Sequence, residues 1–190
     1  MKKYLYFAIA VVFAATSVNC SSTKTTDTIA KGDVEVNIPL SSPEHRSDKK
    51  FWRAVQMGTS TDVSMAKKVA LQNARQDLAA TVQSQIKAVI ENYGQNASMG
   101  AKTQNETLYQ ELTTTVINQT LIGAELKDEK LIKTAEGSNR YHVCLQISKE
   151  EVGEQIIEKL SEDEKLKLEF DRERFKKIYD EEMAKFIENR

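Results

Sequence analysis

Apolar residues recur at every fourth position along residues 63–93, which is the spacing that forms one face of an α-helix. A cluster of helix N-cap formers at residues 59–62 precedes this stretch, and no glycine or proline interrupts it before Gly94. We therefore predict one long helix here, whose first alanines would let it lie close to a sheet or another helix. The apolar positions are Ala66, Ala70, Ala74, Leu78, Val82, Ile86, Val89 and Tyr93.

Strand patterns lie on both sides of this helix. Residues 51–57 mix aromatic and β-branched side chains and are followed by Gly58, which predicts a first strand. Residues 121–133 and 140–147 predict a hairpin around the turn at 136–139. In the second arm of the hairpin every other residue is apolar, so one face of this strand suits packing against the long helix. These apolar residues are Tyr141, Val143, Leu145 and Ile147.

A second helix is predicted over residues 104–120. It follows a polar loop at residues 94–103, and Leu108, Leu112 and Val116 again stand four apart. Taken together, the elements predict an α+β fold of order β-α-α-β-β-α. We expect a small three-stranded sheet, with a fourth strand as an alternative, packed by the long alanine-rich helix and the second helix.

The last 42 residues, 149–190, carry 14 acidic and 10 basic side chains. A stripe at Val152, Ile156 and Leu160 predicts a helix, and the capping box at residues 161–164 predicts a new helix or a kink after it. Two interpretations stay open for residues 161–190: a solvated helix whose apolar face folds back on the domain, or an exposed amphipathic segment for a partner. The candidate partner surface consists of Phe170, Phe175, Tyr179, Met183 and Phe186.

Residues 1–19 have the form of a signal peptide, in which two lysines precede an apolar run over residues 5–15. Eleven residues of helix span roughly 16 Å, about half of the hydrocarbon core of a membrane, so we predict no transmembrane helix. Cys20 directly follows this segment, and we expect it to be the lipid attachment site. Conventional signal cleavage after Ser17 is the alternative.

Residues 20–50 are rich in serine and threonine, contain both prolines of the chain and have no aromatic residue. Such a segment buries too little apolar surface to offset the entropy lost on ordering, so it predicts a flexible tether. Within it, His45 is expected to be solvated. The alternation of Val34, Val36 and Ile38 with polar residues allows a short edge strand before Pro39. The folded module is expected over residues 51–160.

The remaining composition limits the chemistry that this chain can perform. A net charge of −1 argues against a dedicated nucleic-acid binder, and two cysteines cannot form a disulfide-rich scaffold or a four-cysteine zinc site. His142 and Cys144 share one face of the last predicted strand, but two ligands do not make a zinc site. The sequence contains no phosphate loop, nucleophile elbow or calcium loop. We therefore predict no enzyme activity, no metal and no cofactor.

Several of these features, taken together, resemble those of a known protein family. Arg53-Ala54 and Gly58 lie on the opening strand, Ala74-Arg75 on the long helix and residues 141–145 on the closing strand, after a lipoprotein-like signal. Over residues 50–157 the chain resembles the small bacterial outer-envelope lipoproteins of the Lpp-twenty family, which are related to domains of flagellar and secretion-associated lipoproteins. The resemblance implies an α+β domain attached to a membrane by its N-terminal lipid, with no catalytic residues.

These observations lead to an expected function. We predict a non-catalytic, lipid-anchored cell-envelope protein that acts as a structural or interaction module, with the membrane and another envelope protein as partners. Because Ser21 stands where an aspartate retains many lipoproteins at the inner membrane, the periplasmic face of the outer membrane is favoured. The alternative is a periplasmic carrier that binds a small apolar or lipidic ligand between helix and sheet, near Val82, Ile86 and Val143. A cell-wall hydrolase would need a convergent catalytic constellation, and the sequence contains none.

Overall fold

The computed structural model describes residues 36–96, 102–166, 168 and 170–188. Residues 38–190 form one compact unit, and the fold described below is that of this unit. In chain order its elements are the 3-10 helix η1 (Pro43–His45), β1 (Phe51–Ser60), α1 (Val63–Asn96), α2 (Lys102–Ile122), β2 (Glu125–Lys133), β3 (Asn139–Ser148), α3 (Lys149–Glu162) and α4 (Arg172–Glu188).

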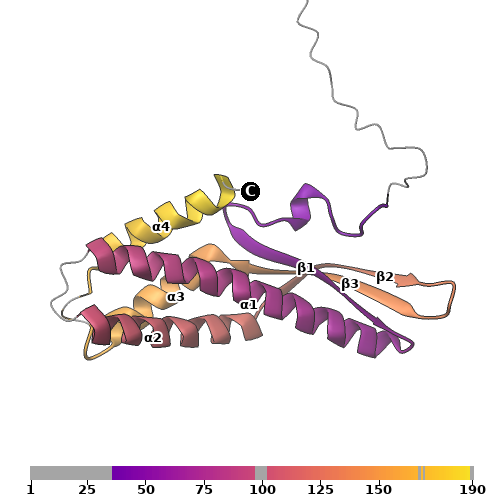
Figure 1. The fold of residues 1–190 in the computed structure, drawn as a ribbon, viewed down its shortest axis with the longest axis horizontal. Coiled ribbons are helices and arrows are strands. Elements are labelled where there is room, and N and C mark those ends of the chain that lie inside the picture. The colour runs from indigo at the N-terminus through magenta and orange to yellow at the C-terminus, as the bar shows by residue number, and fades with distance from the viewer. Residues whose placement is uncertain (1–35, 97–101, 167, 169, 189–190) are drawn as a thin grey trace, which may run out of the picture. The chain divides into compact units, whose positions relative to one another are not determined.

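The predicted α+β fold and its order of elements are confirmed. The three strands form one antiparallel sheet in the order β1-β3-β2, so that β3 is the central strand (Figure 1). The register places Trp52 opposite Ile147 and Gly58 opposite Tyr141. Residues 36–38, the described part of the additional edge strand that the sequence allowed, are not in a strand. Within the described residues the sheet therefore has three strands.

Helix α1 covers one face of this sheet and packs on β1 and β3. Asp62 begins the helix, because its side-chain oxygen accepts a hydrogen bond from the backbone N–H of Met65 at 2.7 Å. The buried alanines of the first half of α1, such as Ala66 and Ala70, bring the helix backbone close to β1. A Cβ atom added to Gly58 would lie only 2.2 Å from the carbonyl oxygen of Ala66. The small side chains of the alanine stripe thus permit the close approach that the sequence predicts.

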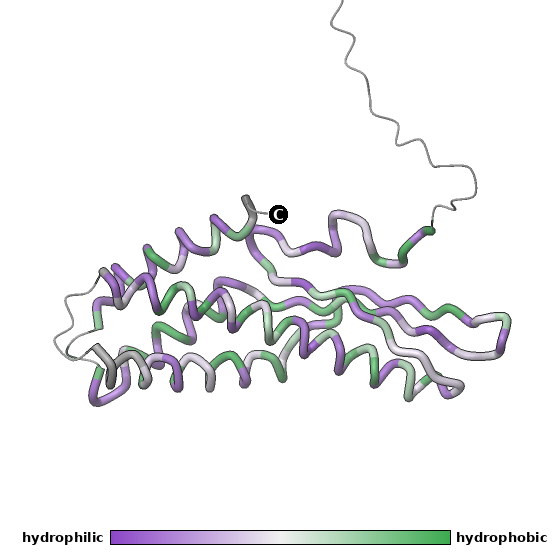
Figure 2. Tube along the Cα trace, viewed as in Figure 1, coloured by the Kyte–Doolittle hydropathy of each residue, from purple (hydrophilic) through white to green (hydrophobic). Residues whose placement is uncertain are grey.

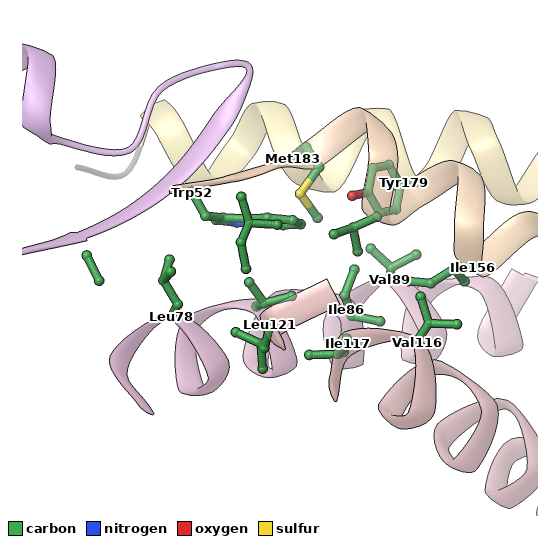
Figure 3. Packing of buried hydrophobic residues seen from close by; sticks show 14 of the residues in the cluster. Trp52, Leu78, Ile86, Val89, Val116, Ile117, Leu121, Ile156, Tyr179 and Met183 are labelled. Carbon is green, nitrogen blue, oxygen red and sulfur yellow. The ribbon is translucent and has the colours of Figure 1, made fainter. Parts of the chain in front are cut away.

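The second half of α1 lies among the other helices. Helix α2 runs back alongside it, and α4 packs against it as well (Figure 1). Side chains from all of these elements meet in one core, in which Trp52 of β1 lies beside Met183 of α4 and above Leu78 and Ile86 of α1 (Figure 3). At the end of α1, Tyr93 contacts further aromatic rings in the same core, those of Tyr109, Phe170 and Phe175.

The C-terminal residues form two helices that pack on the core. Ser148 caps α3 by accepting the N–H of Glu151, and the helix ends before Asp163. The side chain of Asp163 then accepts the N–H groups of Lys165 and Leu166, so the predicted interruption at residues 161–164 lies at this turn. Hydrophobic and hydrophilic positions alternate along α4, as expected of a helix with one buried face (Figure 2).

Two predicted boundaries are corrected by this fold. The compact unit begins at residue 38 rather than 51, so residues 38–50 are part of the folded unit and not of a tether. It also extends beyond residue 160 and includes residues 161–190, in agreement with the interpretation in which this segment folds back on the domain. His45, expected to be solvated, is 7% exposed. The extended boundaries and the burial of His45 all result from contacts with other elements of the unit, which composition does not reveal.

Candidate functional site

The candidate site is a cavity of about 660 Å³ between α3, α4 and the start of β1, which we call the α3–α4 groove. This volume falls within the range of about 300–1,000 Å³ that is usual for ligand pockets. Its apolar lining comes from all three elements. The lining side chains without charge include Phe51, Ile157, Tyr179, Met183 and Ala184.

The floor of the groove depends on a close approach between α3 and α4. A Cβ atom added to Gly153 on α3 would lie 2.9 Å from the ring of Tyr179 on α4, so a glycine is needed for the present packing. The hydroxyl of Tyr179 donates to the backbone carbonyl of Lys149 at 2.6 Å. Burial, with a smaller contribution from Asp180, raises the pKa of Tyr179 above its ordinary value. The phenol therefore acts as a structural donor that ties α4 to the start of α3.

Charged side chains of both signs stand around the opening. The cations are Lys49, Lys50 and Lys176, and the anions are Glu150, Glu154 and Asp180. Within the described part of the chain, no ion pair shorter than 4 Å joins any of these six groups to an opposite charge. The groove thus combines an apolar floor with charges that are available to a bound molecule.

Lys149 lines the same groove but has a different environment. This residue is 2% exposed, and its ammonium group lies 5.6 Å from the ring centre of Trp52 and 5.0 Å from that of Phe186. Cation–π attraction of this kind is strongest where water is excluded. Trp52 is itself held by a hydrogen bond of 2.7 Å from its indole N–H to the side chain of Gln85. Lys149 therefore lines the groove, while its ammonium group lies near two aromatic rings that pack in or against the core.

A second feature lies on the face of the sheet opposite to α1. Residues 42–48, which we call the strap, pass over the centre of β3, where the thiol of Cys144 donates to the carbonyl of His45 at 3.8 Å. His45 also reaches β2, because its Nε2 lies 2.9 Å from a carboxylate oxygen of Asp128. At the other end of the strap, the guanidinium of Arg53 on β1 donates to Asp48 at 2.7 Å.

The free edge of β2 is a poor docking surface, although the strand is exposed. A bulge between Leu126 and Asp128 breaks its register with β3. The carboxylate of Asp128 also accepts the backbone N–H of Glu129 at 2.8 Å, so this donor is already satisfied. Bulges and charged residues of this kind protect the edges of sheets against pairing with another chain. We therefore place the candidate site at the α3–α4 groove.

The side chains that the sequence predicted as a partner surface are not exposed in the structure. Phe175, Tyr179 and Met183 are buried and Phe170 and Phe186 are half-buried, all packed in the core, so the prediction that they form an exposed surface is wrong. The apolar face of α4 packs on the rest of the unit, and its side chains form part of the shared core. Tyr179 and Met183 do line the α3–α4 groove, whereas the three phenylalanines do not.

The remaining predicted positions lie partly within and partly outside the described residues. Cys20 and the signal peptide at residues 1–19 lie outside the described residues. His142 and Cys144 do share one face of β3, but no three His, Cys, Asp or Glu side chains in the described ranges cluster as metal ligands would. Burial and the nearby Arg140 and Lys130 lower the pKa of His142. Among the described helices, none has the length and apolarity needed to cross a bilayer.

The pocket predicted for a carrier is filled by side chains. Val82, Ile86 and Val143, which were expected to line it, are all 1% exposed or less and belong to the core. A cavity that Ile86 does line is found between α1 and α2 and holds about 210 Å³, which is below the usual range for ligand pockets. The helix–sheet interface is therefore packed at the predicted place.

Sequence reasoning missed the α3–α4 groove and the strap. One signal for the groove was present, since Gly153 interrupts an otherwise regular amphipathic helix and such a glycine often marks a close approach. The strap carries no comparable signal, because it is held by hydrogen bonds between polar side chains and distant strands. Comparison of the chain with protein-family models, with curated proteins and with solved structures found no match.

Proposed function

We propose that this chain is a non-catalytic, lipid-anchored protein of the cell envelope, which holds a segment of another envelope protein in the α3–α4 groove. The observation that carries the proposal is the pairing of an apolar floor with six charged groups that make no ion pair with one another. A polypeptide segment can supply apolar side chains for the floor and charges of both signs for the rim. A purely apolar ligand would leave these charges unused.

The anchor in this proposal is Cys20, and the location is the periplasmic face of the outer membrane. Both rest on the sequence, in which two lysines precede a short apolar run over residues 5–15, and Cys20 follows a few residues later, before Ser21. Several acyl chains at about 0.8 kcal/mol per buried CH₂ would hold the protein durably at a membrane. The folded unit would then present its groove within reach of other proteins anchored nearby.

Metabolic labelling with a fatty acid tests the anchor. We expect the full chain to be labelled and recovered with the membranes, because an acylated Cys20 cannot leave the bilayer readily. The Cys20→Ala variant should be unlabelled, while its folded unit, which lies far from this position in the sequence, should unfold at the same temperature. A labelled variant, or an unlabelled parent chain, would contradict the lipid attachment.

Photo-crosslinking in intact cells tests the groove. A photoreactive residue in place of Glu154, on the rim, should give a discrete adduct with one envelope protein. Reversal of a rim charge by Lys176→Glu should reduce the adduct several-fold, because the charge opposite the partner changes sign. The matched control is Lys159→Glu, an exposed charge reversal on α3 outside the groove, which should leave the yield unchanged. Equal yields in the two variants would exclude the groove as the binding site.

A further inference from the structure

Another cavity, which we call the polar cavity, lies where α2 passes into β2 and β3 passes into α3 (Figure 1). It holds about 420 Å³, which is within the range of about 300–1,000 Å³ that is usual for ligand pockets. Its lining differs from that of the α3–α4 groove. Three glutamines, two glutamates, a serine, a threonine and one phenylalanine face it, and among the described residues no lysine or arginine does.

One wall of the polar cavity holds an amide in a fixed orientation. The Nε of Arg53, whose side chain is 7% exposed, donates to the side-chain oxygen of Gln146 at 3.1 Å. A guanidinium cannot accept a hydrogen bond, so the oxygen of Gln146 must face Arg53 and its nitrogen must point away. That nitrogen donates to one carboxylate oxygen of Glu125 at 3.1 Å. The second N–H of the amide and the second oxygen of the carboxylate remain for a bound molecule.

The other wall repeats this arrangement on α3. The amide nitrogen of Gln155 lies 3.4 Å from a carboxylate oxygen of Glu151, which can only accept. The oxygen of Gln155 therefore faces Thr120, whose hydroxyl hydrogen is shared between this oxygen and the carbonyl of Val116, each at 2.9 Å. Ser148 lies between the two walls, and its oxygen accepts the N–H of Glu151. The hydrogen of its hydroxyl is thus available as a further donor.

These groups limit the chemistry of a ligand for the polar cavity. The formal charges in the lining are those of Glu125 and Glu151, both negative, so a phosphate or an acidic molecule would be repelled. Each carboxylate already accepts from a neighbouring amide and stands beside that amide's remaining N–H. Donors and acceptors therefore alternate along both walls. A hydroxyl group donates and accepts at once, so a molecule with several hydroxyl groups uses both kinds of partner.

We infer that the polar cavity is a binding site for a neutral saccharide. The amides and carboxylates of the two walls bind its hydroxyl groups, and the ring of Phe51 supplies an apolar surface for the C–H face of a sugar ring. Phe51 is itself held by the guanidinium of Arg53, which lies 5.2 Å from the centre of the ring. This inference goes beyond the proposed function and does not depend on it, since it requires neither the lipid on Cys20 nor a protein in the groove.

Calorimetric titration of the full chain tests the class of ligand. The neutral probes are the trimer of N-acetylglucosamine and maltotriose, which differ in their acetamido groups. The charged probes are trigalacturonate, an acidic saccharide, and spermidine, a cation. We expect at least one neutral trimer to bind with a Kd of about 1 mM or lower, and trigalacturonate to bind at least about tenfold more weakly. Binding of a charged probe alone, or of none of the four, would overturn the inference.

Two variants locate the site. Gln155→Leu removes an amide that lines the polar cavity but not the α3–α4 groove, and should weaken the binding of the neutral trimer by about five- to tenfold. The matched control is Gln76→Leu, an exposed position on α1 outside the cavity, which should leave the Kd unchanged. Equal Kd values in these two variants would place any binding elsewhere and overturn the inference.

Glu125→Gln provides a test that does not depend on loss of binding. This exposed side chain keeps its size and loses its negative charge, so the neutral trimer should still bind while the affinity for trigalacturonate rises several-fold. A structural role alone would not change the preference between neutral and acidic saccharides. Thermal unfolding verifies that each variant is folded. An unchanged preference in Glu125→Gln would contradict a site lined by this carboxylate.

Discussion

Replacing Gly58 by valine is expected to destabilise the folded unit by more than about 4 kcal/mol, which is large for a single substitution. The reason is that a Cβ atom at this position would lie 2.2 Å from the carbonyl oxygen of Ala66 and 2.6 Å from the backbone nitrogen of Ala70. Both atoms belong to the backbone of α1, which cannot rotate away as a side chain would. The helix would have to move off the sheet and open the core between them.

Urea unfolding followed by the fluorescence of Trp52 and by circular dichroism measures this loss. Gly94→Ala is the matched control, because no atom lies within 4 Å of a Cβ at that position near the end of α1. Alanine is a better helix former than glycine, so this control should be neutral or more stable by about 0.5–1 kcal/mol. A stable Gly58→Val protein with an unchanged midpoint would show that α1 does not lie on β1 as described.

The close approach at Gly58 illustrates how far the sequence predicts this fold. The alanine stripe predicts that α1 lies close to another element, and the glycine after the first strand is visible beside it. The sequence alone does not show that the two features meet, since the glycine was interpreted as the end of the strand. In fact β1 continues to Ser60, with Gly58 opposite Tyr141. Local periodicity predicts elements, but pairing between distant elements is decided by the packing of the whole unit.

Residues 38–50, which include the strap, show the opposite case. Residues 38–50 have few apolar side chains, and a segment of such composition predicts disorder because it buries little apolar surface. Here the ordering comes from hydrogen bonds to groups that β1, β2 and β3 hold in place, among them Asp128, Arg53 and Cys144. Asp128 and Cys144 lie 83 and 99 residues away from His45 in the sequence. No pattern in a single sequence predicts contacts of this kind.

The C-terminal residues show both a feature that local patterns predict and one that depends on distant contacts, and these residues form part of the groove. Their charge predicts a solvated face and their apolar residues a buried one, and the sequence left open whether the buried face meets this unit or a partner. In the structure it meets this unit, and the turn around Asp163 brings α4 back against α3. The charges that remain outside, such as Lys176 and Asp180, then stand around the α3–α4 groove. The candidate site is therefore made in part by the segment for which the sequence left both interpretations open.

Phe175 provides the sharpest test of whether α4 belongs to the folded unit. Its side chain is 0% exposed and contacts the rings of Tyr93 and Phe170, at centroid distances of 5.3 and 5.5 Å. Replacing it by alanine should destabilise the unit by about 3–5 kcal/mol, through the loss of buried apolar contacts and the cavity that remains. The loss should appear in one cooperative unfolding transition, since α4 shares its core with α1.

Leu168→Ala is the matched control, because it removes apolar side-chain atoms from the same C-terminal part of the chain at a position that is 90% exposed. Its stability should stay within about 0.5 kcal/mol of the parent chain. Urea unfolding of both variants, monitored by circular dichroism and by the fluorescence of Trp52, separates two possibilities. If α4 were an exposed arm for a partner, the two variants would unfold at the same urea concentration. If α4 completes the core, only Phe175→Ala unfolds early, and truncation at Glu162 would remove the same contacts and abolish cooperative unfolding.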